Sequence, residues 1–200
     1  MLVEGIKSRP VYATLAPRPG RLHLLVANEE GGPALLDLLG AAPQGFAADA
    51  HVTYVPGGSA GAGHVTRLAA AGPASLREVP TAAAALALVR DALAAARMGT
   101  QVYAAGTEDF IGQVVQTALD AGMELGAIGA EHRGSLERRV QCVHCKSITE
   151  RVTTQPVSCS GCGRVLLVRD HYSRRIGAFQ GVCIDAEEPG TAPPPEPVFA

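Results

Sequence analysis

Residues 142–162 read CVHCKSITERVTTQPVSCSGC, and this stretch holds four of the five cysteines in the chain. The four form two C-x2-C pairs, Cys142 with Cys145 and Cys159 with Cys162. Two such pairs, separated by roughly a dozen residues, have the ligand spacing of a four-thiolate metal site. Gly161 and Gly163 give the second pair the backbone freedom that a tight turn needs. The sequence therefore predicts that the four sulfur atoms hold one metal ion in a small rubredoxin-like or zinc-ribbon-like β module.

The identity of the metal stays open between iron and zinc, because tetrahedral sulfur coordination suits both ions. Zinc would make the site a structural clasp, since a closed shell of four thiolates leaves no position for a substrate. Iron in the same shell would relay single electrons. The spacing does not match the plant-type pattern of a two-iron cluster. His144 lies inside the first pair, and we expect it beside the site or exposed, because four cysteines are available as ligands.

We expect these cysteines to be thiolates on a metal rather than disulfides. The chain begins with no signal-peptide pattern, so nothing in it indicates an oxidising compartment. No apolar run approaches the ~20 residues that cross a bilayer, so we expect a soluble, cytoplasmic protein without a membrane partner. The fifth cysteine, Cys183, is expected to be a small, buried apolar side chain.

The composition allows one hydrophobic core and a small appendage, because 47% of the 200 residues are hydrophobic. A net charge of −2 and an aromatic content of 4% argue against a nucleic-acid partner, which needs positive charge and stacking side chains. Basic residues nevertheless cluster around the cysteine pairs. They are Arg133, Arg138, Arg139, Lys146, Arg164, Arg169, Arg174 and Arg175. Such a cluster is either a solvated face or a contact for a phosphate or an acidic protein.

Strand-like and helix-like segments alternate between residues 20 and 130. Apolar runs predict strands at residues 22–27, 51–55, 76–79, 101–105 and 124–128. Helical spacing and capping residues predict helices at residues 34–39, 81–98 and 107–121. Residues 57–64, rich in Gly, Ser and Ala, are predicted to form a flexible loop. The alternation predicts an open, mostly parallel, three-layer α/β sheet, which binds ligands at the carboxyl ends of its strands.

These patterns divide the chain into three parts. Residues 1–132 are expected to form the α/β domain, and residues 138–185 the four-cysteine metal-binding domain. The remaining residues, 186–200, are rich in proline and are predicted to be disordered.

The segment QVYAAGTEDFIGQVVQTALDAG, residues 101–122, resembles the nicotinamide-nucleotide-binding module of ferredoxin reductases, which implies a Rossmann-like fold. Glu131 is the nearest match to a glutamate of that family. The glycine-rich phosphate loop of the family corresponds here to residues 27–33, where Glu29 and Glu30 would place like charge beside the phosphates. The resemblance therefore implies a degenerate domain, and we expect no nucleotide binding. A nucleotide-binding regulator remains as an alternative.

Residues 140–182 resemble the DmmA-like family of dimethylamine monooxygenase components. The resemblance rests on the two cysteine pairs and on the run Asp-His-Tyr-Ser-Arg-Arg at residues 170–175. It implies a small subunit of a multi-component oxidative N-demethylase. In such systems a haem-containing subunit performs oxygen chemistry on a secondary amine, while electrons come from a flavin and iron–sulfur reductase subunit.

The sequence shows no constellation of catalytic side chains, whether Ser/His/Asp, Cys/His or paired carboxylates. We therefore expect a non-catalytic subunit that links the reductase to the haem subunit or relays electrons between them, rather than a stand-alone enzyme. The alternative is a structural zinc-ribbon adaptor with no redox role. The polar side chains of residues 170–175 are expected either to brace the sulfurs or to contact a partner.

Overall fold

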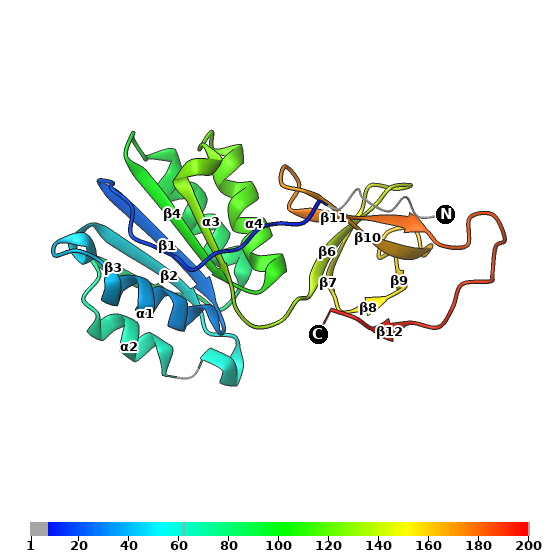
Figure 1. Ribbon diagram of the computed structural model, residues 1–200, viewed down its shortest axis with the longest axis horizontal. Coiled ribbons are helices and arrows are strands. Elements are labelled where there is room, and N and C mark those ends of the chain that lie inside the picture. The colour runs from blue at the N-terminus through cyan, green and yellow to red at the C-terminus, as the bar shows by residue number, and fades with distance from the viewer. Residues whose placement is uncertain (1–7, 62, 200) are drawn as a thin grey trace. The chain divides into compact units, whose positions relative to one another are not determined.

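The computed structural model describes residues 8–61 and 63–199. Two compact units divide these residues (Figure 1). One comprises residues 11–134, and the other joins residues 8–10 to residues 135–199. The sequence placed residues 8–10 in the α/β domain, and the structure corrects this. The reason is a pair of backbone hydrogen bonds, from Ser8 N–H to the Asp170 carbonyl and from Tyr172 N–H to the Ser8 carbonyl, each 2.9 Å long.

The unit of residues 11–134 contains the predicted parallel sheet, in the order β3-β2-β1-β4-β5. Its strands are β1 (Leu22–Asn28), β2 (Ala50–Val55), β3 (Ser75–Glu78), β4 (Thr100–Gly106) and β5 (Ile128–His132). Its helices are α1 (Gly31–Ala41), α2 (His64–Ala70), α3 (Ala82–Ala94) and α4 (Glu108–Asp120), with short 3-10 turns at η1 (Phe46–Asp49), η2 (Gly58–Gly61) and η3 (Leu125–Ala127). The three-layer, Rossmann-like α/β fold is thus confirmed.

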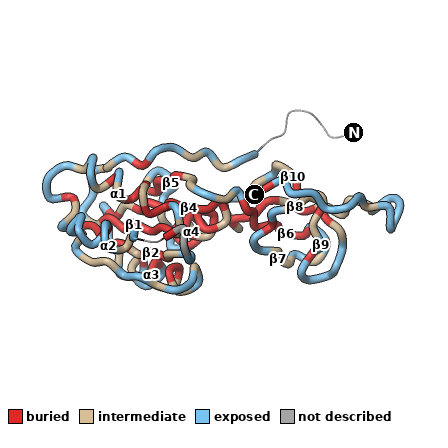
Figure 2. The backbone as a smooth tube through the Cα atoms, turned by 90° about the horizontal axis from the view of Figure 1, so that it is seen from below, coloured by how far each residue is buried: buried red, intermediate tan, exposed pale blue. Residues whose placement is uncertain are grey.

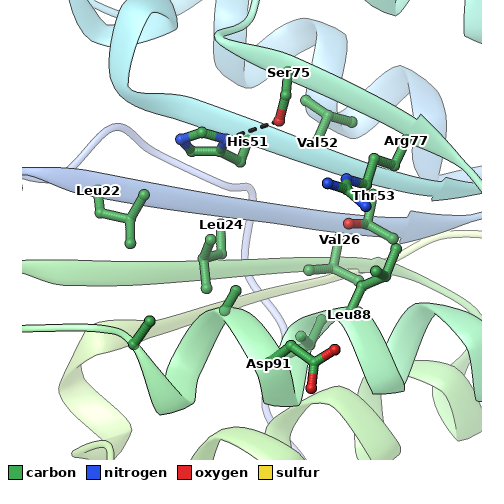
Figure 3. A pocket seen from close by; sticks show the side chains of 13 residues that line it. Leu22, Leu24, Val26, His51, Val52, Thr53, Ser75, Arg77, Leu88 and Asp91 are labelled. Carbon is green, nitrogen blue, oxygen red and sulfur yellow. Dashed lines mark hydrogen bonds between the residues drawn. The ribbon is translucent and has the colours of Figure 1, made fainter.

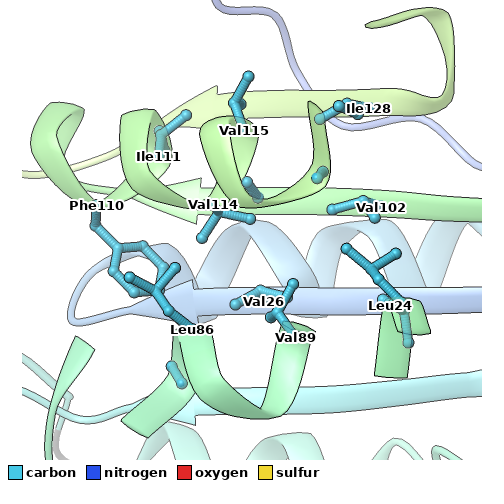
Figure 4. Packing of buried hydrophobic residues seen from close by; sticks show 14 of the residues in the cluster. Leu24, Val26, Leu86, Val89, Val102, Phe110, Ile111, Val114, Val115 and Ile128 are labelled. Atoms are coloured by element: carbon cyan, nitrogen blue, oxygen red, sulfur yellow. The ribbon is translucent and has the colours of Figure 1, made fainter. Parts of the chain in front are cut away.

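The central strands β1 and β4 bury both of their faces, which explains why they read as continuous apolar runs. Leu24 and Val26 of β1 pack with α3 and α4, as Figure 4 shows. Leu25 and Ala27 point to the opposite face and pack with α1. The sheet is therefore covered by α1 and α2 on one face and by α3 and α4 on the other.

Two local predictions for this unit were wrong. Residues 57–64, expected to be a loop, contain η2 and the first residue of α2. The helix α2 has seven residues and one fully buried side chain, Leu68, so its local sequence carries little helical signal. The last strand begins at Ile128 rather than at Glu124, because η3 takes up the residues before it. The predicted cap of α3 is confirmed, since Thr81 Oγ1 accepts a hydrogen bond from Ala84 N–H at 3.2 Å.

The second unit is built from short strands around the cysteine pairs. The strands β6 (Arg138–Cys142), β7 (Ile148–Val152), β9 (Val157–Ser158), β10 (Val165–Ser173) and β11 (Ala178–Cys183) form a sheet in the order β7-β6-β11-β10-β9. Only the β6–β11 pair of this sheet is parallel. The hydrophobic core of the unit is small and contains eight buried side chains, two of which are cysteines. The eight core residues are Val140, Cys142, Val152, Cys159, Leu166, Val168, Phe179 and Phe199.

The end of the proline-rich tail is packed, whereas the sequence predicts disorder over residues 186–200. Figure 2 shows the mostly exposed residues 186–195, which lead to this packed end. Strand β12 (Glu196–Pro197) pairs with β8 (Thr154–Gln155). Phe199 is 6% exposed and lies 4.1 Å from the buried Arg138 guanidinium, whose other face covers Phe179. A cation between two aromatic rings stabilises this end of the chain, and a compositional argument does not detect it.

Among the described residues, no helix combines the length and the hydropathy that crossing a membrane requires.

We predict that His23 in β1 makes the folded state sensitive to acid. The side chain is 3% exposed, its ring stacks on Phe46 at a centroid distance of 4.0 Å, and its Nδ1 has no hydrogen-bond partner among the described residues. Burial lowers the pKa of His23 below its ordinary 6.5, against a smaller opposing effect of Asp49. On acidification, His23 therefore binds a proton more readily in the unfolded chain than in the folded protein. The free energy of unfolding thus falls as the pH drops below about 6.5.

The measurement is chemical denaturation at about pH 7 and about pH 5, on the wild type and on His23→Leu. We expect the variant to lose less unfolding free energy on acidification, by at most about 1.4 kcal/mol per pH unit. An identical pH dependence in the two proteins would contradict this role of His23.

Candidate metal centre

The two cysteine pairs bring their sulfur atoms together at one end of the small sheet. The Sγ atoms of Cys142, Cys145, Cys159 and Cys162 all lie within 4.8 Å of one another. The distance is 3.9 Å between Cys142 and Cys162, and 3.5 Å between Cys145 and Cys159. A tetrahedral site with metal–sulfur bonds of about 2.3 Å has sulfur–sulfur edges of about 3.8 Å, whereas a disulfide needs about 2.05 Å. The four cysteines could therefore hold a metal ion, and all five cysteines of the chain are free of disulfides.

The first turn runs from Cys142 to Ser147 and is closed by two backbone hydrogen bonds. The Lys146 N–H donates to the Cys142 carbonyl at 3.0 Å, and the Cys142 N–H donates to the Ser147 carbonyl at 2.9 Å. Lys146 has a φ of 65°, in the left-handed region that costs a residue with a side chain roughly 1–2 kcal/mol. Its Nζ donates to the Val143 carbonyl at 2.7 Å. The turn therefore has a strained backbone conformation at the residue directly after the second cysteine of the pair.

The second turn repeats this pattern. The Gly163 N–H donates to the Cys159 carbonyl at 2.9 Å, and the Cys159 N–H donates to the Arg164 carbonyl at 2.8 Å. Gly163 has a φ of 72°, as a tight turn requires, and occupies the position of Lys146 in the first turn. Gly161 has a different role, because a Cβ there would overlap the Ser147 hydroxyl and lie 3.3 Å from the Cys145 sulfur. Gly161 thus lets the two turns approach each other.

Hydrogen bonds and desolvation separate the pKa values of two of the thiols. The hydroxyl and the N–H of Ser147 donate to Cys145 and lower the pKa of its thiol to about 6. The Arg164 N–H lowers the pKa of Cys162, but desolvation and the three neighbouring sulfurs outweigh it and raise this pKa to about 11. Because like charges repel, four thiolates at these distances require a cation between them.

The site has a buried side and an exposed side. Cys142 and Cys159 are 0% and 3% exposed and belong to the core of the unit. Cys145 is half-buried, and Cys162 is exposed. His144 is also exposed, lies 3.2 Å from the Arg164 guanidinium and stays outside the cysteine cluster, as the sequence predicts.

The remaining polar residues that the sequence singled out lie away from the sulfurs. Asp170 forms ion pairs with Arg9 and Arg138, and the positive charge of these partners holds the pKa of its carboxyl below the ordinary range despite desolvation. Tyr172 packs its ring on Phe179 at a centroid distance of 5.0 Å. These contacts brace the unit itself rather than the sulfurs.

The structure corrects the expectation that Cys183 is a buried apolar side chain. Cys183 is half-buried and donates to Asp185 Oδ1 at 3.2 Å.

At the switch-point crevice of the α/β sheet, beside the carboxyl ends of β1 and β4, two of the chain's own residues bond to each other. Asn28 Oδ1 accepts a hydrogen bond from Thr107 N–H, and Asn28 Nδ2 donates to Thr107 Oγ1, each at 3.0 Å. Glu108 and Asp109 supply the negative charge that the start of α4 favours. The start of α4 is therefore surrounded by the chain's own polar and acidic groups.

Glu131, the residue matched to the ferredoxin-reductase glutamate, is also used internally. It is 6% exposed, accepts from Leu15 N–H at 2.7 Å and accepts from Arg133 Nε at 2.7 Å. The Tyr12 hydroxyl donates to Glu108 at 3.2 Å. The segment before β1 is thus fixed by the carboxylates beside the crevice.

A separate pocket of about 420 Å³ lies on the face of the sheet that α3 covers (Figure 3). Leu22, Leu24 and Val26 of β1 form part of its apolar lining. Its polar lining residues are His51, Thr53, Ser75, Arg77 and Asp91, and His51 Nδ1 lies 2.8 Å from Ser75 Oγ. The pocket is over the early residues of the strands rather than at their carboxyl ends.

Two family models match the sequence. The model described as dimethylamine monooxygenase subunit DmmA-like, N-terminal domain, matches residues 4–128, and that of the C-terminal domain matches residues 139–182. A curated relative, the heme-dependent oxidative N-demethylase delta subunit of Ectopseudomonas mendocina (strain ymp), is 32% identical over 115 residues. The match covers 58% of this chain and 66% of that relative.

Solved structures with a similar part include the cytochrome P450 reductase GcoB of Amycolatopsis, with a TM-score of 0.45 and 16% identity. That similarity covers 66% of this chain and 46% of GcoB. The siderophore-interacting protein SipS of Aeromonas hydrophila gives a TM-score of 0.42 and 15% identity, over 58% of this chain and 51% of SipS.

We predict that Ser147→Ala raises the pKa of the Cys145 thiol from about 6 towards the ordinary value of 9, because the variant lacks the hydroxyl donor. The measurement is the pH dependence of alkylation of the metal-free protein, followed at Cys145 by peptide mass spectrometry. Ser160→Ala is the matched control, since the Ser160 hydroxyl donates to the Ile148 carbonyl at 3.3 Å instead. Unchanged alkylation of Cys145 in Ser147→Ala would refute this role of the hydroxyl.

Proposed function

The chain belongs to the dimethylamine monooxygenase subunit DmmA-like family, and on this basis we propose that it is a non-catalytic, metal-binding subunit of an oxidative N-demethylase complex. The curated relative is named as a subunit of a heme-dependent oxidative N-demethylase, which supports the same assignment here. The observation that carries the proposal is the convergence of four cysteine sulfurs within 4.8 Å.

The proposed ligands are Cys142, Cys145, Cys159 and Cys162. Iron on four thiolates would supply one-electron redox chemistry, whereas zinc would supply only structural stability. With iron, the proposed role is to relay single electrons from a flavin and iron–sulfur reductase subunit to a haem-containing subunit. The exposed position of Cys162 supports this role, because an electron carrier needs one edge of its centre near the surface.

The α/β unit is proposed to serve in assembly rather than in nucleotide binding. The support is the bridge between Asn28 and Thr107, together with the two acidic residues that begin α4. A dinucleotide would have to break these contacts and place its phosphates beside carboxylates, which is unfavourable.

A structural zinc adaptor without a redox role is the second candidate, and the small core of the metal unit favours it. Its eight buried side chains include two of the proposed ligands. A core of this size supplies little folding free energy by itself, so a bound zinc ion would contribute to folding directly.

We predict that the chain, expressed together with the haem and reductase subunits, co-purifies with them and carries one metal ion. Cys159→Ser is expected to lose the ion, because its sulfur is one of four converging ligands. Cys183→Ser, which also removes one thiol, is the matched control and should retain the ion. Elemental analysis and visible spectra then separate the candidates, since a four-thiolate iron site is red and bleaches on reduction, whereas zinc is colourless. Retention of metal and association by Cys159→Ser would refute the proposal.

We predict no saturable binding of reduced or oxidised nicotinamide nucleotides, measured by calorimetric titration of the wild-type protein. An Asn28→Ala variant tests the physical reason, because it frees the Thr107 N–H for a phosphate. Binding by the wild type with a dissociation constant in the micromolar range, about −8 kcal/mol, would overturn the proposed loss of the nucleotide site.

A further inference from the structure

The segment of the second unit that contains the two cysteine pairs carries a charge that the composition of the whole chain conceals. Residues 138–183 contain eight Lys and Arg side chains and only two carboxylates, Glu150 and Asp170, although the chain has a net charge of −2. Four thiolates around a divalent ion would remove only two of these positive charges. This segment therefore stays basic with its metal bound, and the acidic residues that compensate it lie on either side of it in the same unit, at Glu137, Asp185, Glu187, Glu188 and Glu196.

Many of these cations are used inside the unit. Arg138 pairs with Asp170 and Arg139 pairs with Glu150. Arg151 pairs with Glu137, which lies just before β6. Lys146 and Arg164 differ, because both are exposed and neither forms an ion pair among the described residues. Arg164 interacts electrostatically with Asp185, whose carboxyl accepts from Gly190 N–H and Cys183. The pKa of Asp185 is lowered by these donors and by the charge of Arg164.

These two cations flank the exposed edge of the candidate metal centre. Lys146 directly follows Cys145, and Arg164 follows Cys162 after one residue. The two turns that contain the cysteines therefore also contain these positive charges. His144 joins the two turns through its 3.2 Å contact with Arg164, and Val143 adds an apolar side chain that is 37% exposed. We call Val143, His144, Lys146, Cys162 and Arg164 the knuckle face.

We propose that the knuckle face is a docking surface for a carboxylate-rich protein surface on another subunit of the N-demethylase complex. This inference rests on the proposed function and adds the site and chemistry of the contact. Exposed cations around an apolar residue are the complement of a patch of Asp and Glu side chains, and such charges increase association rates and fix orientation. Docking here would bring the partner next to the exposed Cys162 sulfur.

A double charge reversal tests the surface. Lys146→Glu with Arg164→Glu changes the knuckle face, and Arg174→Glu with Arg175→Glu is the matched control with the same change in net charge. Arg174 and Arg175 are exposed in the turn after β10, whose nine residues separate them from Arg164 by about 30 Å. Metal content and thermal unfolding confirm that both variants are folded.

The readout is association with the haem and reductase subunits, purified together without this chain, measured by biolayer interferometry between about 0.05 and 0.3 M salt. We expect the knuckle-face variant to bind at least about tenfold more weakly at low salt and to lose most of its salt dependence. The control variant should bind within about twofold of the wild type.

Three results would overturn the inference. Equal weakening by the two double variants would mean that only net charge matters, and unchanged binding by the knuckle-face variant would place the contact elsewhere. Saturable wild-type binding of a single-stranded oligonucleotide, abolished in the knuckle-face variant, would show that the partner class is wrong. A wild-type chain that does not associate with the subunits at any salt concentration would instead refute the proposed function, and the inference with it.

Discussion

Repulsion between four sulfur atoms is the constraint on which the second unit depends. Two cysteines lie in its small core and two at its edge, and all four sulfurs are within 4.8 Å. Cys145 has its pKa lowered to about 6 by Ser147, while that of Cys162 is raised to about 11. The cysteine cluster thus favours a thiolate at Cys145 and resists one at Cys162, and a bound cation would stabilise the thiolate form at both positions. The strained Lys146 and the close approach at Gly161 are the cost of this convergence.

The α/β unit shows how a ligand-binding architecture can be used for internal contacts. Its strand order creates a switch point, where open sheets of this kind bind their ligands. Asn28 and Thr107 bind each other at that point, and Glu131 and Glu108 hold the segment before β1. Each of these contacts joins residues that lie far apart in the sequence. These contacts are the basis of the proposal that this domain serves in assembly rather than in nucleotide binding.

Charge in the metal unit is arranged in two ways. Buried cations stabilise the unit itself, and Arg138 is the clearest case, because it pairs with Asp170 and lies between the rings of Phe179 and Phe199. Through Asp170 and Ser8 this arrangement also fixes residues 8–10 to β10. The exposed cations on the two turns form no ion pair within the described part of the chain. Their place in the two cysteine turns connects the surface charge of the unit to its candidate metal centre.

The sequence by itself determined the parallel α/β layer and the cluster of four cysteines, because periodicity, capping and ligand spacing are local properties of a chain. The family was accessible for the same reason, since the run Asp-His-Tyr-Ser-Arg-Arg is contiguous. Only the tertiary structure decided that α2 forms, that β5 starts at Ile128 and that Phe199 is buried. These outcomes depend on contacts between residues far apart in the chain, such as Phe199 with Arg138 or Gly161 with Ser147, and no short window of sequence contains both partners.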